Sequence, residues 1–320
     1  MTRLPRLASL TADAAGWGYF FCSYKEVRAG RSGSEFLFLS LQDSTGQIVA
    51  KVMADVDRYK HEFEDGEFVR VEGHGSVYNG QLQLVLTSIR RVNPDQDRLQ
   101  GFREEDCILS ALRPIDEMWA ELHEHLRGVN NDHIRVLLNR VVADNEAQLR
   151  VWPAAQQIHH AYRGGFLEHI TKMAEVGRLL ARAYDANEDL VLAGVVLHDI
   201  GKLQELAYEG GSGSYTRDGN LVGHITLGVV MVREQINGIA NFPPELRSQI
   251  EHLILSHHGV REHGSPVEPK TIEAFIVASV DELDAKLNQV RKAIAADPGD
   301  GEFTAWHKRL GRVLYKPSDR

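Results

Sequence analysis

The sequence predicts a multi-domain chain of mixed α and β class, in which a five-stranded β-barrel is followed by a larger all-helical part. Three observations predict this. Short β-type segments end near residue 92, a polar segment containing Pro94 follows at 93–101, and apolar residues then recur every three or four positions. We therefore expect a barrel domain at 1–95 and a helical domain at 151–320, joined by 96–150, which forms a helical linker and the start of the helical domain.

The strand signals occur in the order of an OB barrel, with a helical segment after the third strand. Aromatic and β-branched runs at 19–24, 36–41 and 48–52 are separated by turns that contain glycine, and the polar segment 55–63 has room for one or two helical turns. A strand at 68–73 comes next. It is followed by a hairpin in which Asn79-Gly80 joins 75–78 to 81–86. We expect this OB-fold domain to bind nucleic acid.

Seven segments of the larger part have helical periodicity: 115–126, 132–144, 166–184, 187–197, 221–236, 244–255 and 271–296. The segment 187–197 is apolar nearly all round, which predicts a buried central helix. The glycine-rich stretch 210–214 lacks the lysine of a phosphate-binding loop, and we interpret it as a flexible connector.

Composition excludes several classes of protein. The net charge of -9 disfavours a broad basic face for duplex nucleic acid. Cys22 and Cys107 are too far apart in the sequence to suggest a disulfide framework or a thiolate zinc site. No apolar run reaches the length of about 18 residues that a membrane span needs, and the first residues lack the apolar core of a signal peptide. We therefore expect a cytoplasmic protein without a membrane partner.

Histidines gather in one stretch of the helical part. Nine of the 15 lie between residues 159 and 263. His198 and Asp199 follow the predicted buried helix, where a carboxylate needs a cation or strong hydrogen-bond donors to offset its desolvation. One imidazole nitrogen and one carboxylate suit manganese or iron better than zinc, which prefers thiolates in structural sites.

The order of these side chains resembles the HD-domain metal-dependent phosphohydrolase superfamily; the residues that carry the likeness are His169, His198, Asp199, His224, His257, His258 and Asp281. Flanking sequence is more similar to the YhaM-type 3′→5′ exoribonuclease family: HHAYRGGFLEH at 159–169, HDIGK at 198–202 and LILSHHG at 253–259. The resemblance extends to the barrel, through QDSTGQIVAK at 42–51 and YNGQLQL at 78–84, and so covers nearly the whole chain.

The resemblance implies two divalent metal ions, with Mn preferred and Fe, Mg, Co and Ni as alternatives. Four side chains would bind the first ion: His169, His198, Asp199 and Asp281. The second ion would share Asp199 and take His224 with His257 or His258. Adjacent residues of a helix point about 100° apart, so the choice between the last two stays open and both are candidates.

Two such ions activate a water molecule and neutralise charge on the attacking and leaving oxygens of a phosphodiester. Besides Asp199, we assign Lys202 and Arg163 to the catalytic set, because either cation could contact a phosphate; each could also simply pair with a nearby carboxylate. Two adjacent histidines, His159 and His160, are candidates for contact with the substrate or for support of the metal ligands. Asp284 could support a ligand or pair with a lysine.

On the barrel, Tyr78, Arg31 and Lys51 are candidate contacts to a single strand, through base stacking and charge. Residues 1–95 carry 11 Lys+Arg and 12 Asp+Glu, so this domain is not a strongly basic platform. Other aromatic residues of the barrel are expected to belong in part to its core.

We therefore expect a metal-dependent 3′→5′ exonuclease that hydrolyses single-stranded RNA to nucleoside monophosphates, with single-stranded DNA as a further candidate substrate. The alternatives are a phosphohydrolase for nucleotides or cyclic dinucleotides, a nucleic-acid-binding protein with a silent HD domain, and a diiron oxygenase. No Gly-Tyr-Pro follows 257–259, which disfavours the HD-GYP subgroup. A homo-oligomer is a candidate state that nothing in the sequence specifically supports.

Overall fold

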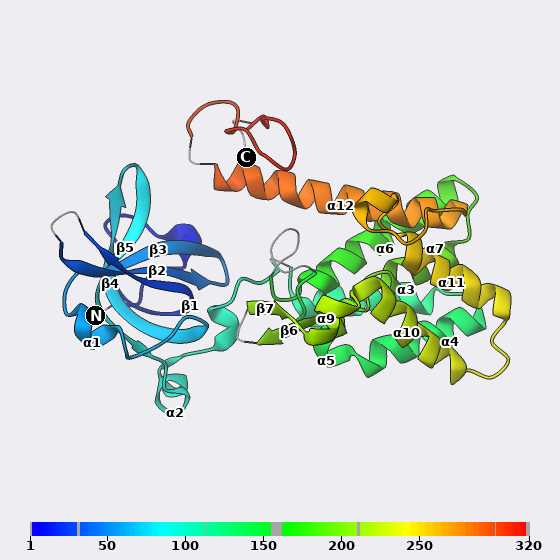
Figure 1. The fold of residues 1–320 in the computed structure, drawn as a ribbon, viewed down its shortest axis with the longest axis horizontal. Coiled ribbons are helices and arrows are strands. Elements are labelled where there is room, and N and C mark those ends of the chain that lie inside the picture. Colours follow the sequence, from blue (N-terminus) through cyan, green and yellow to red (C-terminus); the bar gives the residue numbers. More distant parts are fainter. Residues whose placement is uncertain are drawn as a thin grey trace. The chain divides into compact units, whose positions relative to one another are not determined.

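The structure is a computed structural model that describes residues 2–30, 33–111, 113–154, 162–209, 212–297 and 299–317 (Figure 1). The chain divides into two compact units. The first comprises Met1–Ser110 with Tyr208–Ser212, and the second comprises Ala111–Ala207 with Gly213–Arg320. Within the described residues, no helix has both the length and the apolar character that crossing a membrane requires.

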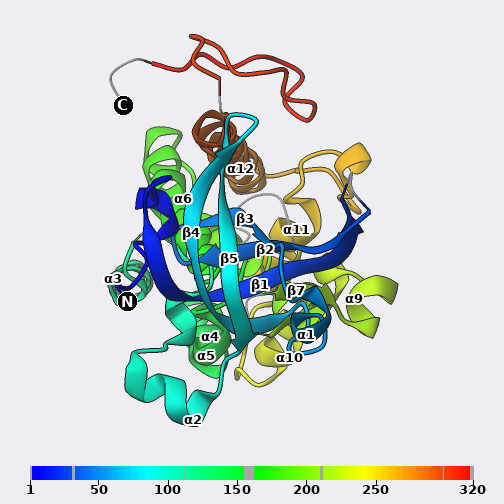
Figure 2. The ribbon, with the colours of Figure 1, turned by 90° about the vertical axis from the view of Figure 1, so that its left-hand side faces the viewer.

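The first unit is built on a closed barrel with the strand order β1-β2-β3-β5-β4 (Figure 2). Its strands are β1 (Ala15–Ala29), β2 (Glu35–Asp43), β3 (Gly46–Val52), β4 (Glu67–Tyr78) and β5 (Gln81–Arg91), and the short helix α1 (Val56–Tyr59) follows β3. Neighbouring strands are antiparallel except β3 and β5, whose parallel pairing closes the barrel. The predicted OB fold is confirmed.

One strand differs from its prediction, because β4 is continuous where the sequence indicated two strands separated near Gly73 and Gly75. A β-carbon on Gly73 would lie 2.4 Å from the carbonyl oxygen of Val85, and one on Gly75 would lie 2.2 Å from that of Thr11. The register with β5 shifts between Glu72 and Gly73. These glycines therefore permit a bulge and close backbone contacts within a strand, rather than ending it.

After the barrel, the helix α2 (Pro94–Asp97) delivers a carboxylate into the interior of the first unit. Asp97 is fully buried, and Arg90 donates two hydrogen bonds to it at 2.8 and 2.7 Å. The Tyr19 hydroxyl donates at 3.0 Å and the Asn93 amide at 2.7 Å. Asp97 therefore joins strands β1 and β5 to the segment that follows the barrel.

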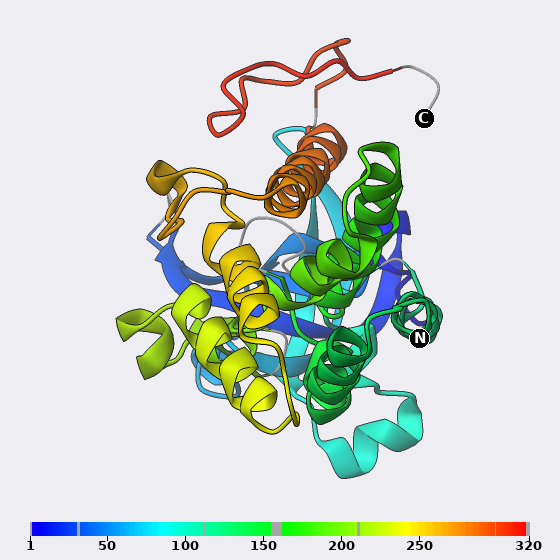
Figure 3. The ribbon, with the colours of Figure 1, turned by 90° about the vertical axis from the view of Figure 1, so that its right-hand side faces the viewer.

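The second unit is mainly helical (Figure 3). Its helices are α3 (Ile115–Arg127), α4 (Asp132–Asp144), α5 (Glu146–Leu149), α6 (Gly165–Ala183), α7 (Glu188–Leu197), α8 (Lys202–Glu205), α9 (Arg217–Leu221), α10 (His224–Asn237), α11 (Pro244–Ser256) and α12 (Ile272–Ala296). Six of the seven predicted helices agree with these to within one residue at each end. The predicted helix 221–236 corresponds to α10, which begins three residues later, because Gly223 has a φ of 77° and separates it from α9.

A two-stranded sheet, β6 (Leu206–Glu209) and β7 (Ser212–Tyr215), lies where we expected a flexible connector. Residues 210 and 211 of that stretch lie outside the described residues.

The helix α7 is the centre of the second unit, as its all-apolar sequence predicts. Every residue from Leu190 to Leu197 is buried, and α7 packs against α4, α6, α11 and α12. Asn187 caps its first turn by accepting from the amides of Asp189 and Leu190. The helix ends at Leu197, so the next two residues lie inside the helical bundle.

Candidate metal centre

Asp199 lies at the centre of the histidine cluster and is almost completely buried. Its Oδ1 lies 3.4 Å from His224 Nε2 and 3.5 Å from His257 Nε2. Its Oδ2 lies 3.3 Å from His198 Nε2 and 2.5 Å from Lys202 Nζ. One carboxylate therefore faces three imidazoles and one ammonium group.

The other predicted ligands form two groups around this carboxylate. In each group the candidate ligand atoms lie within 4.8 Å of one another; the groups are His169 with His198 and Asp281, and His224 with His257 and His258. The structure thus brings all seven predicted ligands together, from five elements far apart in the sequence. His257 and His258 both belong to one group, although adjacent helical residues should diverge. The reason is that α11 ends at Ser256, so the two histidines occupy its cap and the turn after it.

Local sequence explains how the ligands are placed. α6 carries His169, the end of α7 carries His198 and α12 carries Asp281, while α10 begins at His224. A β-carbon on Gly201 would lie 2.0 Å from the carbonyl oxygen of His224, so only glycine permits this approach of the two segments.

Each histidine of the cluster uses its Nδ1 for a contact within the protein. His198 Nδ1 donates to the Val195 carbonyl at 2.8 Å, and His257 Nδ1 donates to the Ile254 carbonyl at 2.7 Å. His258 Nδ1 lies 2.9 Å from the carbonyl oxygen of His263. Because a carbonyl only accepts, Nδ1 carries the proton in these rings and Nε2 keeps its lone pair for a metal.

Two carboxylates orient the remaining histidines. Asp284 Oδ2 lies 2.7 Å from His169 Nδ1, which fits one of the two roles that the sequence left open for Asp284, the support of a ligand. Glu205 Oε1 lies 3.0 Å from His224 Nδ1 and accepts from the His224 amide at 2.9 Å. Nothing in the sequence marked Glu205 for this role, because the contact joins residues on two different helices.

The inner face of the cluster has unmet polar groups. Nε2 of His198, His224 and His257 and Oδ1 of Asp199 are buried, and none forms a hydrogen bond within the described part of the chain. Leaving such groups buried and unpaired is costly. Octahedral ligands about 2.1 Å from a small divalent cation lie about 3 Å apart, close to the 3.3–3.5 Å measured here. The donor set therefore fits a divalent cation of the manganese and iron kind.

The electrostatics of the cluster differ from one residue to the next. Burial alone would raise the pKa of Asp199, but the Lys202 ammonium and the imidazoles of His198 and His257 beside the carboxylate hold the pKa well below its ordinary value. Burial lowers the pKa of His257, and lowers that of His258 to about 4, so both rings are neutral. At His169 burial opposes protonation, but hydrogen bonds to Asp281 and Asp284 raise the pKa to about 9. Metal binding at His169 must therefore release a proton.

The other predicted catalytic residues have different surroundings. Lys202 is buried, and its ammonium group pairs with the carboxylate of Asp199, which is itself a predicted metal ligand. The phosphate contact predicted for Lys202 stays a prediction. The backbone carbonyl of Arg163 accepts a hydrogen bond from the Ala111 amide at 2.9 Å. The contact of the Arg163 side chain with a phosphate stays a prediction. His159, His160 and Arg31 lie outside the described residues.

On the barrel, aromatic rings and cations meet on β1 to β4. Lys51 Nζ lies 4.5 Å from the ring centroid of Tyr78, which is 55% exposed. Lys51 is directly opposite Phe38 in the β2–β3 pairing, and the Arg28 guanidinium lies 3.7 Å from the centroid of Phe38. Tyr24 packs edge-on against Phe38. Both predicted contacts that lie in the described region, Tyr78 and Lys51, are therefore side by side.

Comparisons with known proteins agree with both halves of the structure. Residues 166–286 match the HD domain family, and residues 24–92 match the OB-fold nucleic acid binding domain family. The chain is 34% identical to the 3′-5′ exoribonuclease YhaM of Bacillus subtilis, over 90% of each chain. It is 31% identical to the YhaM of Shouchella clausii, over 94% of this chain and 93% of that one. The chain belongs to the YhaM family of 3′-5′ exoribonucleases.

As a YhaM-family member the chain is an enzyme of the hydrolase class, and the family resemblance seen in the sequence is confirmed. The YhaM of Geobacillus sp. is 33% identical over 89% of this chain and 87% of that one. Among solved structures, the second OB-fold domain of replication protein A from Methanococcus maripaludis is 16% identical, with a TM-score of 0.24 over 29% of this chain and 96% of that domain.

Proposed function

We propose that this YhaM-family enzyme is a 3′→5′ exonuclease that removes nucleoside monophosphates from single-stranded RNA with the help of two divalent cations, Mn²⁺ foremost. The observation that carries the proposal is the convergence of buried imidazole nitrogens and a carboxylate oxygen that lack hydrogen-bond partners within the described chain. Two ligand groups on either side of one carboxylate support two ions rather than one.

In this proposal His169, His198 and Asp281 would hold the first cation, and His224 with His257 and His258 would hold the second. Asp199, which faces both groups, would contribute to each. Such cations lower the pKa of a water molecule and neutralise charge on the scissile phosphodiester. The protein's own contribution is to position the ligands. Asp284 and Glu205 fix two imidazole rings, and the Lys202 ammonium holds the Asp199 carboxylate in its ionised form.

The barrel would capture the substrate. Stacking of bases on exposed rings such as Tyr78, with Lys51 and Arg28 near the backbone, requires unpaired bases. That requirement favours a single strand over a duplex, and it allows single-stranded DNA as a second substrate. Hydrolysis at the terminal phosphodiester leaves the phosphate on the released 5′ position, so the products are 5′-monophosphates. The cytoplasmic location and a homo-oligomeric state stay predictions from the sequence.

The test is a ladder assay with full-length protein and Mn²⁺. The substrates are a 5′-labelled single-stranded RNA, the same RNA in a blunt duplex, the corresponding DNA strand and a cyclic dinucleotide. We expect a ladder that shortens from the 3′ end for the single strands, and none in excess EDTA. Hydrolysis of the cyclic dinucleotide alone would favour the small-molecule phosphohydrolase. Unchanged activity in Asp199→Asn protein would contradict the proposed centre.

A further inference from the structure

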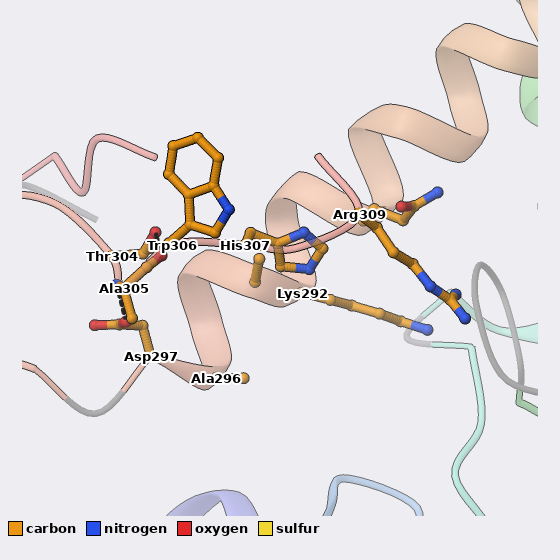
Figure 4. A pocket seen from close by; sticks show the side chains of 10 residues that line it. Lys292, Ala296, Asp297, Thr304, Ala305, Trp306, His307 and Arg309 are labelled. Carbon is orange, nitrogen blue, oxygen red and sulfur yellow. Dashed lines mark hydrogen bonds between the residues drawn. The ribbon is translucent and has the colours of Figure 1, made fainter. Parts of the chain in front are cut away.

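The far end of α12 and the segment after it line an open pocket of about 510 Å³ (Figure 4). Lys292 and Asp297 contribute from the helix side, and Trp306, His307 and Arg309 contribute from the segment. In Figure 4 the side chains of Lys292 and Arg309 extend toward the same side of this pocket. No motif or spacing in the sequence singles out any of these five residues.

The segment is held in a defined conformation against the helix. Asp297 accepts from the Ala305 amide at 2.8 Å and from Lys316 Nζ at 2.8 Å. The Thr304 amide donates to the Leu314 carbonyl at 2.8 Å, and both side chains are buried. Backbone bridges pair 303 with 315 and 307 with 312, so the wall of the pocket is a small hairpin.

The chemistry of the hairpin is unusual for a chain with a net charge of -9. Residues 303–317 contain four Lys or Arg residues and no Asp or Glu: Lys308, Arg309, Arg312 and Lys316, of which Lys316 is paired with Asp297. Three aromatic residues lie among them and are more than half exposed; Phe303 and Tyr315 pack on each other, and Trp306 is the most exposed at 64%. Exposed rings interleaved with cations are the signature of surfaces that bind single-stranded nucleic acid by stacking and charge.

A row of polar side chains connects the metal centre with this pocket along one face of α12. Asp284 contacts His169, Asn288 Nδ2 lies 3.4 Å from the Tyr162 hydroxyl, and Lys292 Nζ lies 5.0 Å from the Tyr162 ring centroid. Residues 281, 284, 288 and 292 are spaced by three and four, so they share this face. From 281 to 292 the helix rises about 16 Å, which equals about five stacked nucleotides at 3.4 Å each.

We propose that this pocket is an upstream subsite for the single-stranded RNA substrate. A base stacks on Trp306, and Lys292 and Arg309 contact the adjoining phosphates, at most about five nucleotides before the scissile bond. This inference rests on the proposed function. The alignment of the polar row with the metal centre favours a substrate strand over a second copy of the chain, which would have no reason to follow that row.

The experiment measures KM for single-stranded RNAs of two, four, six and twelve nucleotides. In the wild type we expect KM to fall as the RNA lengthens to about six nucleotides. Trp306→Ala and Arg309→Gln should each raise KM for the twelve-nucleotide RNA at least fivefold, and leave KM and kcat for the dinucleotide unchanged within twofold. Tyr184→Ala, an exposed aromatic residue at the end of α6, is the matched control.

The outcomes separate this inference from the proposed function. If the wild type shortens no RNA, the proposed function fails. If it shortens RNA but the variants keep the wild-type KM at every length, or lose the dinucleotide equally, the subsite is wrong. A changed oligomeric state in light scattering with an unchanged KM would assign the hairpin to a second copy instead. Arg309→Gln removes only one exposed charge, so this variant still tests the subsite if Trp306→Ala disturbs the fold.

Discussion

His169 lies between two carboxylates of α12, with Nδ1 2.7 Å from Asp284 Oδ2 and Nε2 3.3 Å from Asp281 Oδ1. Asp281 and Asp284 are three residues apart, so one turn of a single helix orients the ring and also places the proposed metal ligand Asp281 beside it. The geometry of this group is therefore set by the rigidity of α12.

Asp284→Asn should weaken Mn²⁺ binding by about 10- to 100-fold, because loss of a carboxylate behind a ligating histidine reduces its basicity and orientation. Nuclease activity should recover when the Mn²⁺ concentration is raised by the same factor. A metal titration of activity and calorimetric Mn²⁺ binding measure both effects. Glu282→Gln, an exposed residue of the same helix that pairs with Lys286, is the control and should bind Mn²⁺ as the wild type does. Failure of high Mn²⁺ to restore Asp284→Asn would point to a structural role only.

Asp199→Asn should abolish metal binding and nuclease activity together, and should also destabilise the second unit by about 3 kcal/mol, because Lys202 is left buried without its partner. Adding Lys202→Met to this variant should restore stability without restoring either metal or activity. Metal content of purified protein and urea unfolding report the two effects separately. Recovery of activity in the double variant would show that Asp199 is no ligand.

His258→Ala and His257→Ala should each reduce the bound Mn²⁺ from two ions to one per chain, since both rings belong to the ligand group with His224. Metal analysis after equilibration at limiting Mn²⁺ gives the stoichiometry. His263→Ala serves as control, because only its backbone carbonyl is used by His258. Two ions in His258→Ala would leave His257 as the single ligand of this pair.

Tyr78→Ala on the barrel should weaken binding of single-stranded RNA about 10-fold through lost stacking, and Lys51→Ala should mainly reduce the dependence of affinity on salt. Fluorescence anisotropy of labelled RNA, with EDTA present to prevent cleavage, measures both. Leu99→Ala, at the most exposed large apolar residue of this unit, is the control. Equal affinity of all four proteins would remove these two residues from the RNA-binding face.

Asp97→Asn should cost about 2 kcal/mol of barrel stability at neutral pH and much less at pH 2. The hydrogen bonds from Arg90 lower the pKa of Asp97 to about 2 from its ordinary 3.8, and a tenfold change in an acid constant corresponds to about 1.4 kcal/mol. A group with a lowered folded-state pKa stabilises the protein above its unfolded pKa, and this contribution is lost as the pH falls from about 4 to 2. Urea-dependent hydrogen exchange of β1 peptides in the full chain measures it, with Asp95→Asn as control. A constant difference between wild type and variant from pH 7 to 2 would contradict this account.

Local signals in the sequence located most elements but not the contacts between them. The helical periods predicted α6, α7 and α12 closely because each buries one stripe or all of its surface. Gly73 and Gly223 show the limit of this method. Gly73 lies against the backbone of the neighbouring strand and lets its own strand continue, whereas Gly223 has open space beside it and separates two helices through its positive φ. The sequence does not distinguish these two settings.

The same limit applies to the candidate site. The order of histidines and aspartates suggested a candidate ligand set through the family resemblance, and the structure brings these side chains together. Glu205 and the roles of Asp284 and His258 depend on contacts between helices or on where a helix ends, which no spacing reveals. The sequence of the hairpin after α12 shows neither helical nor strand periodicity. Only the folded structure shows that its rings and cations lie around a pocket.

The buried ion pair of Lys202 and Asp199 bears on how the enzyme matures in a cell. Its carboxylate is paired with an ammonium group of the same chain. If the enzyme uses the metal ions proposed above, this pairing would compensate the buried charge before any ion is loaded, in contrast to small zinc domains that stay unfolded when apo. A cell short of transition metals would then hold folded but inactive enzyme, which would regain activity when the metals return.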